Sequence, residues 1–318
     1  MIRVPSMFPV GATNCYVVNT GEPSLIDVGL KSRKSYETLI KELASLHLAL
    51  RDIGKIIITH SHVDHFGLIR TLQEESSCDV YVHSDDFQFV SDYEGSYLKR
   101  MDYFGDMMLS AGTPRKVLED LQAAYLFLRD VGDSVTNCRR VDDGDSLVLG
   151  QVRLRVVHTP GHTIGEIGLL WEDNESLFCG DHLLKDITPN VGVTLRERPH
   201  VSLLPDYVRS LQKTIRLPGQ TAFPGHRGVI NDFKKRALEI LQHHEERKAL
   251  MLENVKASER SAFEISKAVF GEVALSEVPL AIAETMSHMK VLEEEGKVHS
   301  LERKGIVYYV ASSNALAS

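Results

Sequence analysis

The chain has 318 residues, 43% of them hydrophobic and 25% charged, and these proportions exclude a disordered or fibrous protein. Its 36 Lys and Arg residues against 44 Asp and Glu residues give a net charge of −8, which disfavours general binding to nucleic acid or anionic lipid. The apolar runs are too short to span a bilayer, and the N-terminus lacks the apolar core of a signal peptide. We therefore expect a soluble, cytoplasmic protein that enters no membrane.

Strand and helix patterns alternate at the start of the chain. Residues 14–19 and 25–29 are strand-like runs on either side of a turn at 20–23. Apolar residues at helical spacing follow over 36–46, and then comes a short apolar strand at 54–59. A polar, histidine-rich loop follows that strand directly, so we expect the loop at the strand's C-terminal end.

Residues 84–137 hold eight of the 22 aromatic residues and three of the eight methionines, with charges between them in a helical pattern. The simpler interpretation is a helical insertion with its own small core. The second interpretation is a substrate lid whose side chains, Phe104 and Met107 among them, contact an apolar ligand. The two interpretations are compatible, and the sequence leaves both open.

Strand patterns return between Ser146 and Gly180, a helix begins near Asp206, and another strand covers 221–223. A long helix then runs from about Asn231 to about Lys256.

The last sixty residues differ in pattern. Ser261 and Glu264 form a capping box for a short helix, a second helix covers about 276–296, and a hairpin follows at 298–310. Two helices followed by a two-stranded wing outline a winged helix. From Ala257 onward six basic residues against nine acidic ones give a net charge of −3, so packing or dimerisation is favoured over DNA binding.

The most specific chemical signal is an HxHxDH segment after the strand at 54–59. It places four strong metal ligands, His60, His62, Asp64 and His65, within six positions. A loop after a strand can direct the first two to one side and the last two to the other. That arrangement supplies two adjacent metal ions rather than one.

Three further segments each place a candidate ligand after a strand. His162 lies 102 residues after His60, in the segment Thr-Pro-Gly-His-Thr. Asp181 follows Phe-Cys-Gly, and His226 follows Pro-Gly. A glycine beside each ligand permits close backbone approach. Each segment has a structural explanation by itself, but together and in this order they favour a metal site.

With these motifs the sequence resembles the metallo-β-lactamase superfamily over roughly residues 1–230. The resemblance implies an α+β fold, an αββα sandwich with a metal site at one edge, here with a helical insertion at about 84–137 and a winged-helix-like domain at 231–318. It implies two divalent metal ions, zinc by expectation, with iron and manganese as alternatives. The first ion would be bound by His60, His62 and His162 and the second by Asp64, His65 and His226, with Asp181 bridging them.

The resemblance also implies a metallo-hydrolase. Two divalent ions lower the pKa of a bridging water and generate a hydroxide, which Asp64 would orient as the catalytic residue. Asp27 resembles the family's carboxylate behind the ligands, and a capping role is the alternative. His182 could reach the substrate or lie behind the ligands. His243 and His244 lie among charges on the long helix, where a solvated face is expected.

The leading hypothesis is hydrolysis of a small-molecule thioester, either acyl-CoA-like or a glutathione thioester. The winged-helix-like C-terminal segment disfavours glutathione. A lactonase is the nearest alternative, because the same hydroxide opens a cyclic ester. An RNA endonuclease is disfavoured by the acidic charge and by the 45 residues that separate Asp181 from His226. A non-catalytic, metal-bound ligand-binding protein is disfavoured by the complete ligand set. We expect no DNA partner, and a homodimer is left open.

Overall fold

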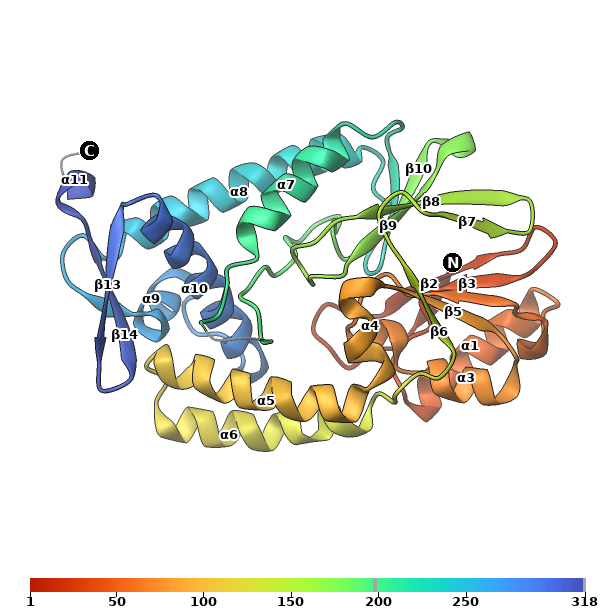
Figure 1. Cartoon of the computed structure of the whole chain (residues 1–318), viewed down its shortest axis with the longest axis horizontal. Helices are drawn as coiled ribbons and strands as arrows, with labels where there is room; N and C mark the ends of the chain where they lie inside the picture. Colours follow the sequence, from red (N-terminus) through yellow and green to blue (C-terminus); the bar gives the residue numbers. More distant parts are fainter. Residues whose placement is uncertain (197–198, 317–318) are drawn as a thin grey trace. The chain divides into compact units, whose positions relative to one another are not determined.

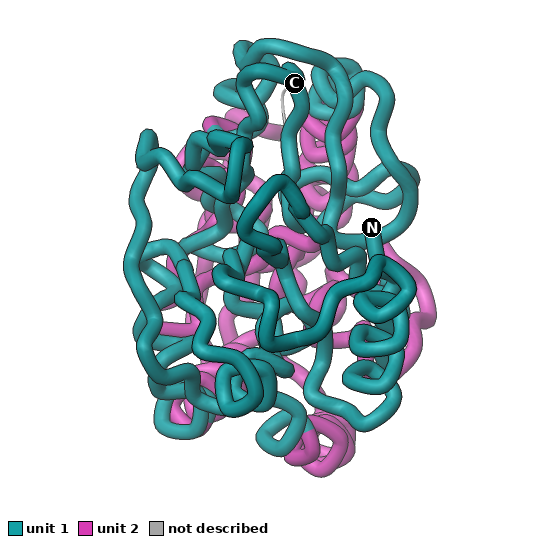
Figure 2. Tube along the Cα trace, turned by 90° about the vertical axis from the view of Figure 1, so that its right-hand side faces the viewer, with its two compact units in different colours: residues 1–97, 128–189, 210–238 teal, residues 98–127, 190–209, 239–318 magenta. Residues whose placement is uncertain are grey.

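The computed structural model describes residues 1–196 and 199–316 (Figure 1). The chain forms two compact units, and Figure 2 shows both: unit 1 comprises residues 1–97, 128–189 and 210–238, and unit 2 comprises residues 98–127, 190–209 and 239–318. Both units are built from discontinuous segments, and the sequence-based boundary after residue 230 stays a prediction. Among the described residues, every helix is too short or too polar to span a lipid bilayer.

Unit 1 begins with a six-stranded sheet in the order β1-β2-β3-β4-β5-β6. Its strands are β1 (Ile2–Val4), β2 (Thr13–Val18), β3 (Ser24–Ile26), β4 (Lys55–Ile57), β5 (Asp79–His83) and β6 (Cys138–Val141). The first three strands pair antiparallel, whereas β3 through β6 pair parallel. Because parallel neighbours run in the same direction, the loops after β3, β4, β5 and β6 leave the sheet at one edge.

The helices of this sheet follow from local sequence. They are α1 (Arg33–Ser45), α2 (Val63–Phe66), α3 (Ile69–Glu75) and α4 (Ser84–Ser91), with a 3₁₀ turn η1 (Leu50–Asp52). Ser32 is the N-cap residue of α1, and its side chain accepts a hydrogen bond from the backbone N–H of Ser35; the helix buries Leu39 and Leu43. It is the crossover that joins the parallel strands β3 and β4, as the sequence predicted (Figure 1).

A second sheet of five strands has the order β11-β10-β9-β8-β7. Its strands are β7 (Ser146–Leu149), β8 (Val152–His158), β9 (Ile167–Trp171), β10 (Ser176–Gly180) and β11 (Thr221–Pro224), with a 3₁₀ turn η3 (Glu172–Asn174). Ile57 and Val141 of the first sheet and Leu154 and Leu169 of the second belong to one buried cluster. The two sheets therefore share a core and form an α/β sandwich.

Unit 2 contains most of the helical insertion and the C-terminal segment. Its elements, some of which begin or end in unit 1, are α5 (Tyr93–Ser110), α6 (Arg115–Tyr125), η2 (Leu126–Asp130), α7 (Leu204–Ile215), α8 (Phe233–Glu253), β12 (Arg260–Ser261), α9 (Ala262–Phe270), η4 (Leu275–Glu277), α10 (Val278–Glu294), β13 (Val298–Arg303), β14 (Ile306–Ala311) and α11 (Ser313–Leu316). The predicted capping box of Ser261 and Glu264 is confirmed. Strands β12, β14 and β13 form a small antiparallel sheet, and the winged-helix comparison stays a prediction.

The structure corrects two expectations in this unit. Phe104 and Met107 are only 4% and 1% exposed, and they pack in a core that also contains Ile265 and Met289 of α9 and α10. The insertion therefore shares its core with the C-terminal helices, and neither side chain is presented to a ligand as a lid would require. His244 is 2% exposed, so it does not lie on a solvated face of α8.

Candidate metal centre

The seven candidate ligands all belong to unit 1 and lie after strands, five of them on loops and two on the short helix α2. The HxHxDH segment follows β4, whereas His162 follows β8, Asp181 follows β10 and His226 follows β11. Strands β10 and β11 are parallel neighbours, so Asp181 and His226 leave the second sheet at the same edge.

Three histidines converge in a first cluster. Nδ1 of His62 lies 3.0 Å from Nε2 of His60 and 2.9 Å from Nε2 of His162. His60 is fully buried, whereas His62 and His162 keep partial exposure. Three imidazole nitrogens that face one point match the ligand set of a borderline-soft divalent ion.

The second cluster consists of Asp64, His65 and His226, all buried. Nε2 of His226 lies 3.2 Å from Nε2 of His65 and 3.3 Å from Oδ2 of Asp64. The short helix α2 carries Asp64 and His65 in consecutive positions, and the backbone N–H of His65 bonds to the carbonyl of His62. The turn brings Asp64 and His65 to His226. The ring centroid of His65 also lies 4.0 Å from that of His60, and His60, His65 and Asp181 form another group of potential ligands, so the two clusters adjoin.

Asp181 lies between the two clusters. Its Oδ2 is 3.7 Å from Nε2 of His162, 3.8 Å from Nε2 of His65 and 3.5 Å from Nε2 of His226. Gly225 makes room for it, because a Cβ atom there would lie 2.4 Å from Oδ1 of Asp181 and 2.7 Å from Cε1 of His65. A carboxylate in contact with both clusters has the position of a bridging ligand.

The far nitrogens of three histidines are already engaged. Nδ1 of His65 bonds to Asp27 at 2.8 Å, Nδ1 of His226 donates to the carbonyl of Ala12 at 3.0 Å, and Nδ1 of His60 lies 3.1 Å from Oγ1 of Thr59. These bonds leave each Nε2 directed at the cluster, which is how metal-binding imidazoles are normally held. Oδ1 of Asp181 is buried and accepts no hydrogen bond from the described residues. The donor set therefore fits two metal ions, and it leaves the identity of the metal open.

The electrostatics agree with this fit. Burial, followed by the neighbouring His65 and His62, lowers the pKa of His60 well below its ordinary value, so His60 is a neutral imidazole that can act as a ligand. Burial by itself would lower the pKa of His65, but the charges of Asp27 and Asp181 raise it to about 10. The carboxylates around the second cluster thus favour positive charge at the centre, which divalent ions would supply.

Asp27 contacts both His65 and Thr59, the residue before His60. Its Oδ1 accepts a hydrogen bond from the backbone N–H of Thr59 at 2.9 Å, and its Oδ2 accepts one from the Thr59 hydroxyl at 2.8 Å. The same oxygen contacts His65. His182, by contrast, is completely buried and lies 2.9 Å through Nε2 from the Thr214 hydroxyl, so the structure places it away from solvent.

Sequence reasoning missed two buried carboxylates beside the ligands. Oε1 of Glu166 accepts a hydrogen bond from the backbone N–H of Asp181 at 2.8 Å and lies 4.0 Å from Nδ1 of His60. Burial, followed by the charge of Asp181, raises the pKa of Glu166 well above its ordinary value. Glu166 lies four residues after His162 and directly before the apolar strand β9, and a charged residue at that position is a signal visible in the sequence. Asp86, in α4, has no comparable signal in the sequence.

His83, Asp85 and His158 form a further group of potential metal ligands. The rings of His83 and His158 are stacked, with centroids 3.8 Å apart. Nδ1 of His83 accepts a hydrogen bond from the backbone of Asp85, and Nε2 of His158 donates to the carbonyl of Ile164 at 2.8 Å. Because the nitrogens near Asp85 are already engaged, this group acts as a packing contact.

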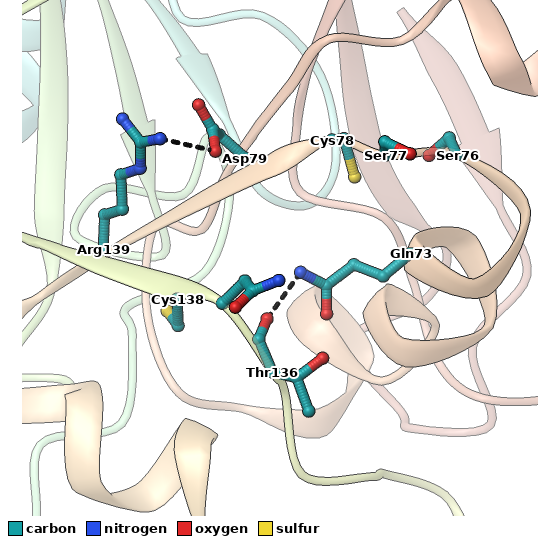
Figure 3. Close-up of a pocket in the computed structure, with 9 residues that line it drawn as sticks. Gln73, Ser76, Ser77, Cys78, Asp79, Thr136, Cys138 and Arg139 are labelled. Carbon is teal, nitrogen blue, oxygen red and sulfur yellow. Dashed lines mark hydrogen bonds and ion pairs between the residues drawn. The ribbon is translucent and has the colours of Figure 1, made fainter.

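A polar pocket of about 510 Å³ lies where β5 and β6 begin, which is the opposite end of these strands from the ligand-bearing edge (Figure 3). The dashed lines in Figure 3 mark the ion pair of Arg139 with Asp79 and the hydrogen bond from Gln73 to Thr136. Burial raises the pKa of the Cys138 thiol to about 12, so this thiol is protonated and a poor nucleophile. We assign this pocket no role in the chemistry.

Comparison with known proteins agrees with the site. A family model described as the metallo-beta-lactamase superfamily matches residues 8–226. The chain is 26% identical to the probable metallo-hydrolase YqjP of Bacillus subtilis (strain 168), over 97% of this chain and 96% of that protein. It is 24% identical to an atrochrysone carboxyl ACP thioesterase of Aspergillus fumigatus, over 85% of this chain and 71% of that protein. The crystal structure of the metallo-beta-lactamase family protein TTHA1429 from Thermus thermophilus has a TM-score of 0.83 and 29% identity, and it covers 98% of this chain and 97% of that chain. The chain belongs to the metallo-β-lactamase superfamily.

Proposed function

We propose that this chain is a dinuclear metal-dependent hydrolase that cleaves a small-molecule thioester. The observation that carries the hydrolase assignment is the pair of ligand clusters with Asp181 between them. Two divalent ions held there would lower the pKa of bound water and polarise the carbonyl that is attacked. The chain's own residues must then hold the ligands rigidly and leave one side open to the substrate.

The burial pattern supports an approach of the substrate from one side. His60, His65 and His226 are buried, whereas His62 and His162 keep partial exposure. A substrate would therefore reach the centre past His62 and His162.

The carboxylate of Asp64 lies 3.3 Å from Nε2 of His226. Burial by itself would raise the pKa of Asp64, but the contact with His226 and the nearby His65 lower this pKa below its ordinary range. Asp64 is thus an ionised acceptor that can orient an attacking water.

Two arguments favour a thioester. A thiolate is a stable leaving group that needs no proton donor, whereas the alkoxide released from a lactone needs one. One relative, the Aspergillus fumigatus protein, is named as a thioesterase that acts on an acyl carrier protein. The lactonase remains the second candidate, because the same centre would open a cyclic ester.

The decisive experiment is elemental analysis of the purified chain, followed by assays against matched thioesters, oxoesters, lactones and RNA, before and after metal removal. We expect two ions per chain and thioester hydrolysis that is lost on chelation and restored by the metal. His226→Ala should retain mainly the ion of the first cluster. One ion or fewer in carefully loaded protein would overturn the dinuclear assignment, and lactone cleavage without thioester cleavage would overturn the substrate.

We further propose that the metal is zinc, that unit 1 has an αββα layer order, that the C-terminal module is winged-helix-like and that the protein is cytoplasmic. The module's net charge of −3 from Ala257 onward also leads us to propose that it binds no DNA, and packing or homodimerisation is its proposed role. Sedimentation of the whole chain with and without duplex DNA tests both the absence of DNA binding and homodimerisation. A salt-sensitive, submicromolar complex with DNA would contradict the proposal that the module binds no DNA.

A further inference from the structure

One carboxylate oxygen of Asp86 accepts hydrogen bonds from two separate loops that carry candidate metal ligands. Asp86 lies in the first turn of α4 and is only 1% exposed. Its Oδ2 accepts a hydrogen bond from the backbone N–H of Ser61 at 2.8 Å and another from the hydroxyl of Thr163 at 3.0 Å. Two loops that are a hundred residues apart in the sequence are thus joined through one buried carboxylate.

Both donors are next to ligands of the first cluster. Ser61 lies between His60 and His62, and Thr163 follows His162 directly. The ligands of the second cluster are held by other groups, as described above: Asp27 contacts His65, and the carbonyl of Ala12 contacts His226. Asp86 therefore supports the first cluster in particular.

The first turn of α4 touches the loop of His162 at further points. A Cβ atom on Gly165 would lie 2.6 Å from Cγ and from the backbone N of Asp86, so only a glycine permits this close packing. His83, the N-cap residue of α4, stacks on His158 with the two rings inclined by 18°. These contacts fix the loop against the helix, so Asp86 cannot relax without moving the loop's backbone.

We propose that Asp86 is a positioning residue for the first metal cluster. By holding Ser61 and Thr163 together, it maintains the 2.9 Å separation of Nδ1 of His62 and Nε2 of His162, and it thereby sets the affinity of this cluster for its ion. The inference rests on the metal-site part of the proposed function and is independent of the substrate.

The test uses His226→Ala as the background, because that substitution leaves the first cluster complete. In this background, Asp86→Ala removes the hydrogen bonds to Ser61 and Thr163, and Thr163→Val removes the bond between Thr163 and Asp86. Asp86→Asn keeps an acceptor, and Thr163→Ser keeps the hydroxyl. Asp85→Asn is the matched control, because it removes the same charge from the same turn of α4 at a side chain that is half-exposed. Zinc affinity is measured by chelator competition, and unfolding of the metal-free protein is measured in urea.

We expect Asp86→Ala to weaken zinc binding by about 10- to 100-fold and Thr163→Val by a smaller factor, as removal of supporting groups does in other metal sites. Asp86→Asn and Thr163→Ser should recover part of the affinity, and Asp85→Asn should change it less than twofold. Equal affinity in Thr163→Val and Thr163→Ser would overturn the proposal, even if Asp86→Ala does not fold. The proposal would also be overturned if Asp86→Ala reduced zinc affinity by the same factor in the complementary His162→Ala background, where only the second cluster is complete. A wild-type chain that binds two ions and cleaves no thioester would refute the substrate and leave this inference standing.

Discussion

Oδ2 of Asp27 lies 2.8 Å from Nδ1 of His65, and both side chains are almost completely buried. Asp27 has a φ of 57°, in the left-handed region that non-glycine residues rarely adopt. The strained backbone turns the carboxylate back toward the loop after β4, where it also binds Thr59. One side chain thus orients a ligand of the second cluster and secures the loop that carries four candidate ligands.

We expect Asp27→Asn to weaken the second cluster more than the first, because Asp27 contacts His65 directly and reaches His60 only through Thr59. Asparagine tolerates the left-handed conformation, so the substitution removes the charge with little added backbone strain. In the His162→Ala background, where the second cluster is complete, zinc affinity should fall by about 10- to 100-fold. Chelator competition measures this loss. An unchanged affinity in that background would show that Asp27 only caps the turn.

Gly225→Ala should displace Asp181. The new Cβ would lie 2.4 Å from Oδ1 of Asp181, a contact that cannot be accommodated without moving the bridging carboxylate or the backbone. Metal stoichiometry should fall below two, and hydrolysis should fall with it. Gly105→Ala in helix α5 is the control, because nothing lies within 4 Å of its Cβ position and alanine favours a helix by about 1 kcal/mol. Full activity and two ions in Gly225→Ala would contradict the bridging position of Asp181.

Met107→Ala should destabilise the protein without changing substrate preference. Met107 is 1% exposed in the core of unit 2, and truncation of such a side chain costs about 2–5 kcal/mol through lost burial and a residual cavity. Urea unfolding should show this loss, while the ratio of KM values for long and short acyl thioesters stays constant. A selective rise in KM for long acyl chains with no loss of stability would restore the interpretation of a lid.

Unit 2 should lose stability in acid because of two buried histidines. Burial, with the charge of the other histidine, lowers the pKa of His244 to about 3, and burial lowers that of His288 to about 4. Between pH 6.5 and 4 the unfolded chain therefore binds more protons at these sites than the folded one, so the free energy of unfolding falls as pH falls. Glu284 acts in the opposite direction, because burial raises its pKa to about 7.

The free energy of unfolding in urea, measured at several pH values from 7 to 4, checks whether the two histidines outweigh Glu284. His288→Gln should make the stability of the folded chain less dependent on pH in this range, because it removes one of the two groups. The same pH dependence in His288→Gln and in the unsubstituted chain would locate the acid sensitivity elsewhere.

Local features of the sequence determined the chemistry of the candidate site. The HxHxDH segment, the glycines beside two of the later ligands (Gly180 and Gly225) and the capping box of Ser261 are short-range patterns, and each has the geometry expected from its residues. The long apolar strands and helices were predicted for the same reason, since periodicity is visible within a few residues. The strands β1, β5 and β6 were missed. Each contains a charged residue, and none has the run of adjacent aliphatic residues by which the equally short β3 and β4 were predicted.

Tertiary structure alone decided what lies behind and between these elements. Asp86 joins Ser61 to Thr163, and Asp181 faces both clusters, because strands distant in the sequence are neighbours in the sheets. Met107 is core rather than lid because α9 and α10 complete the apolar cluster around it. A sequence states which side chains can bind a metal or fill a core. Which of them meet depends on contacts between residues a hundred or more positions apart, and no local pattern records those contacts.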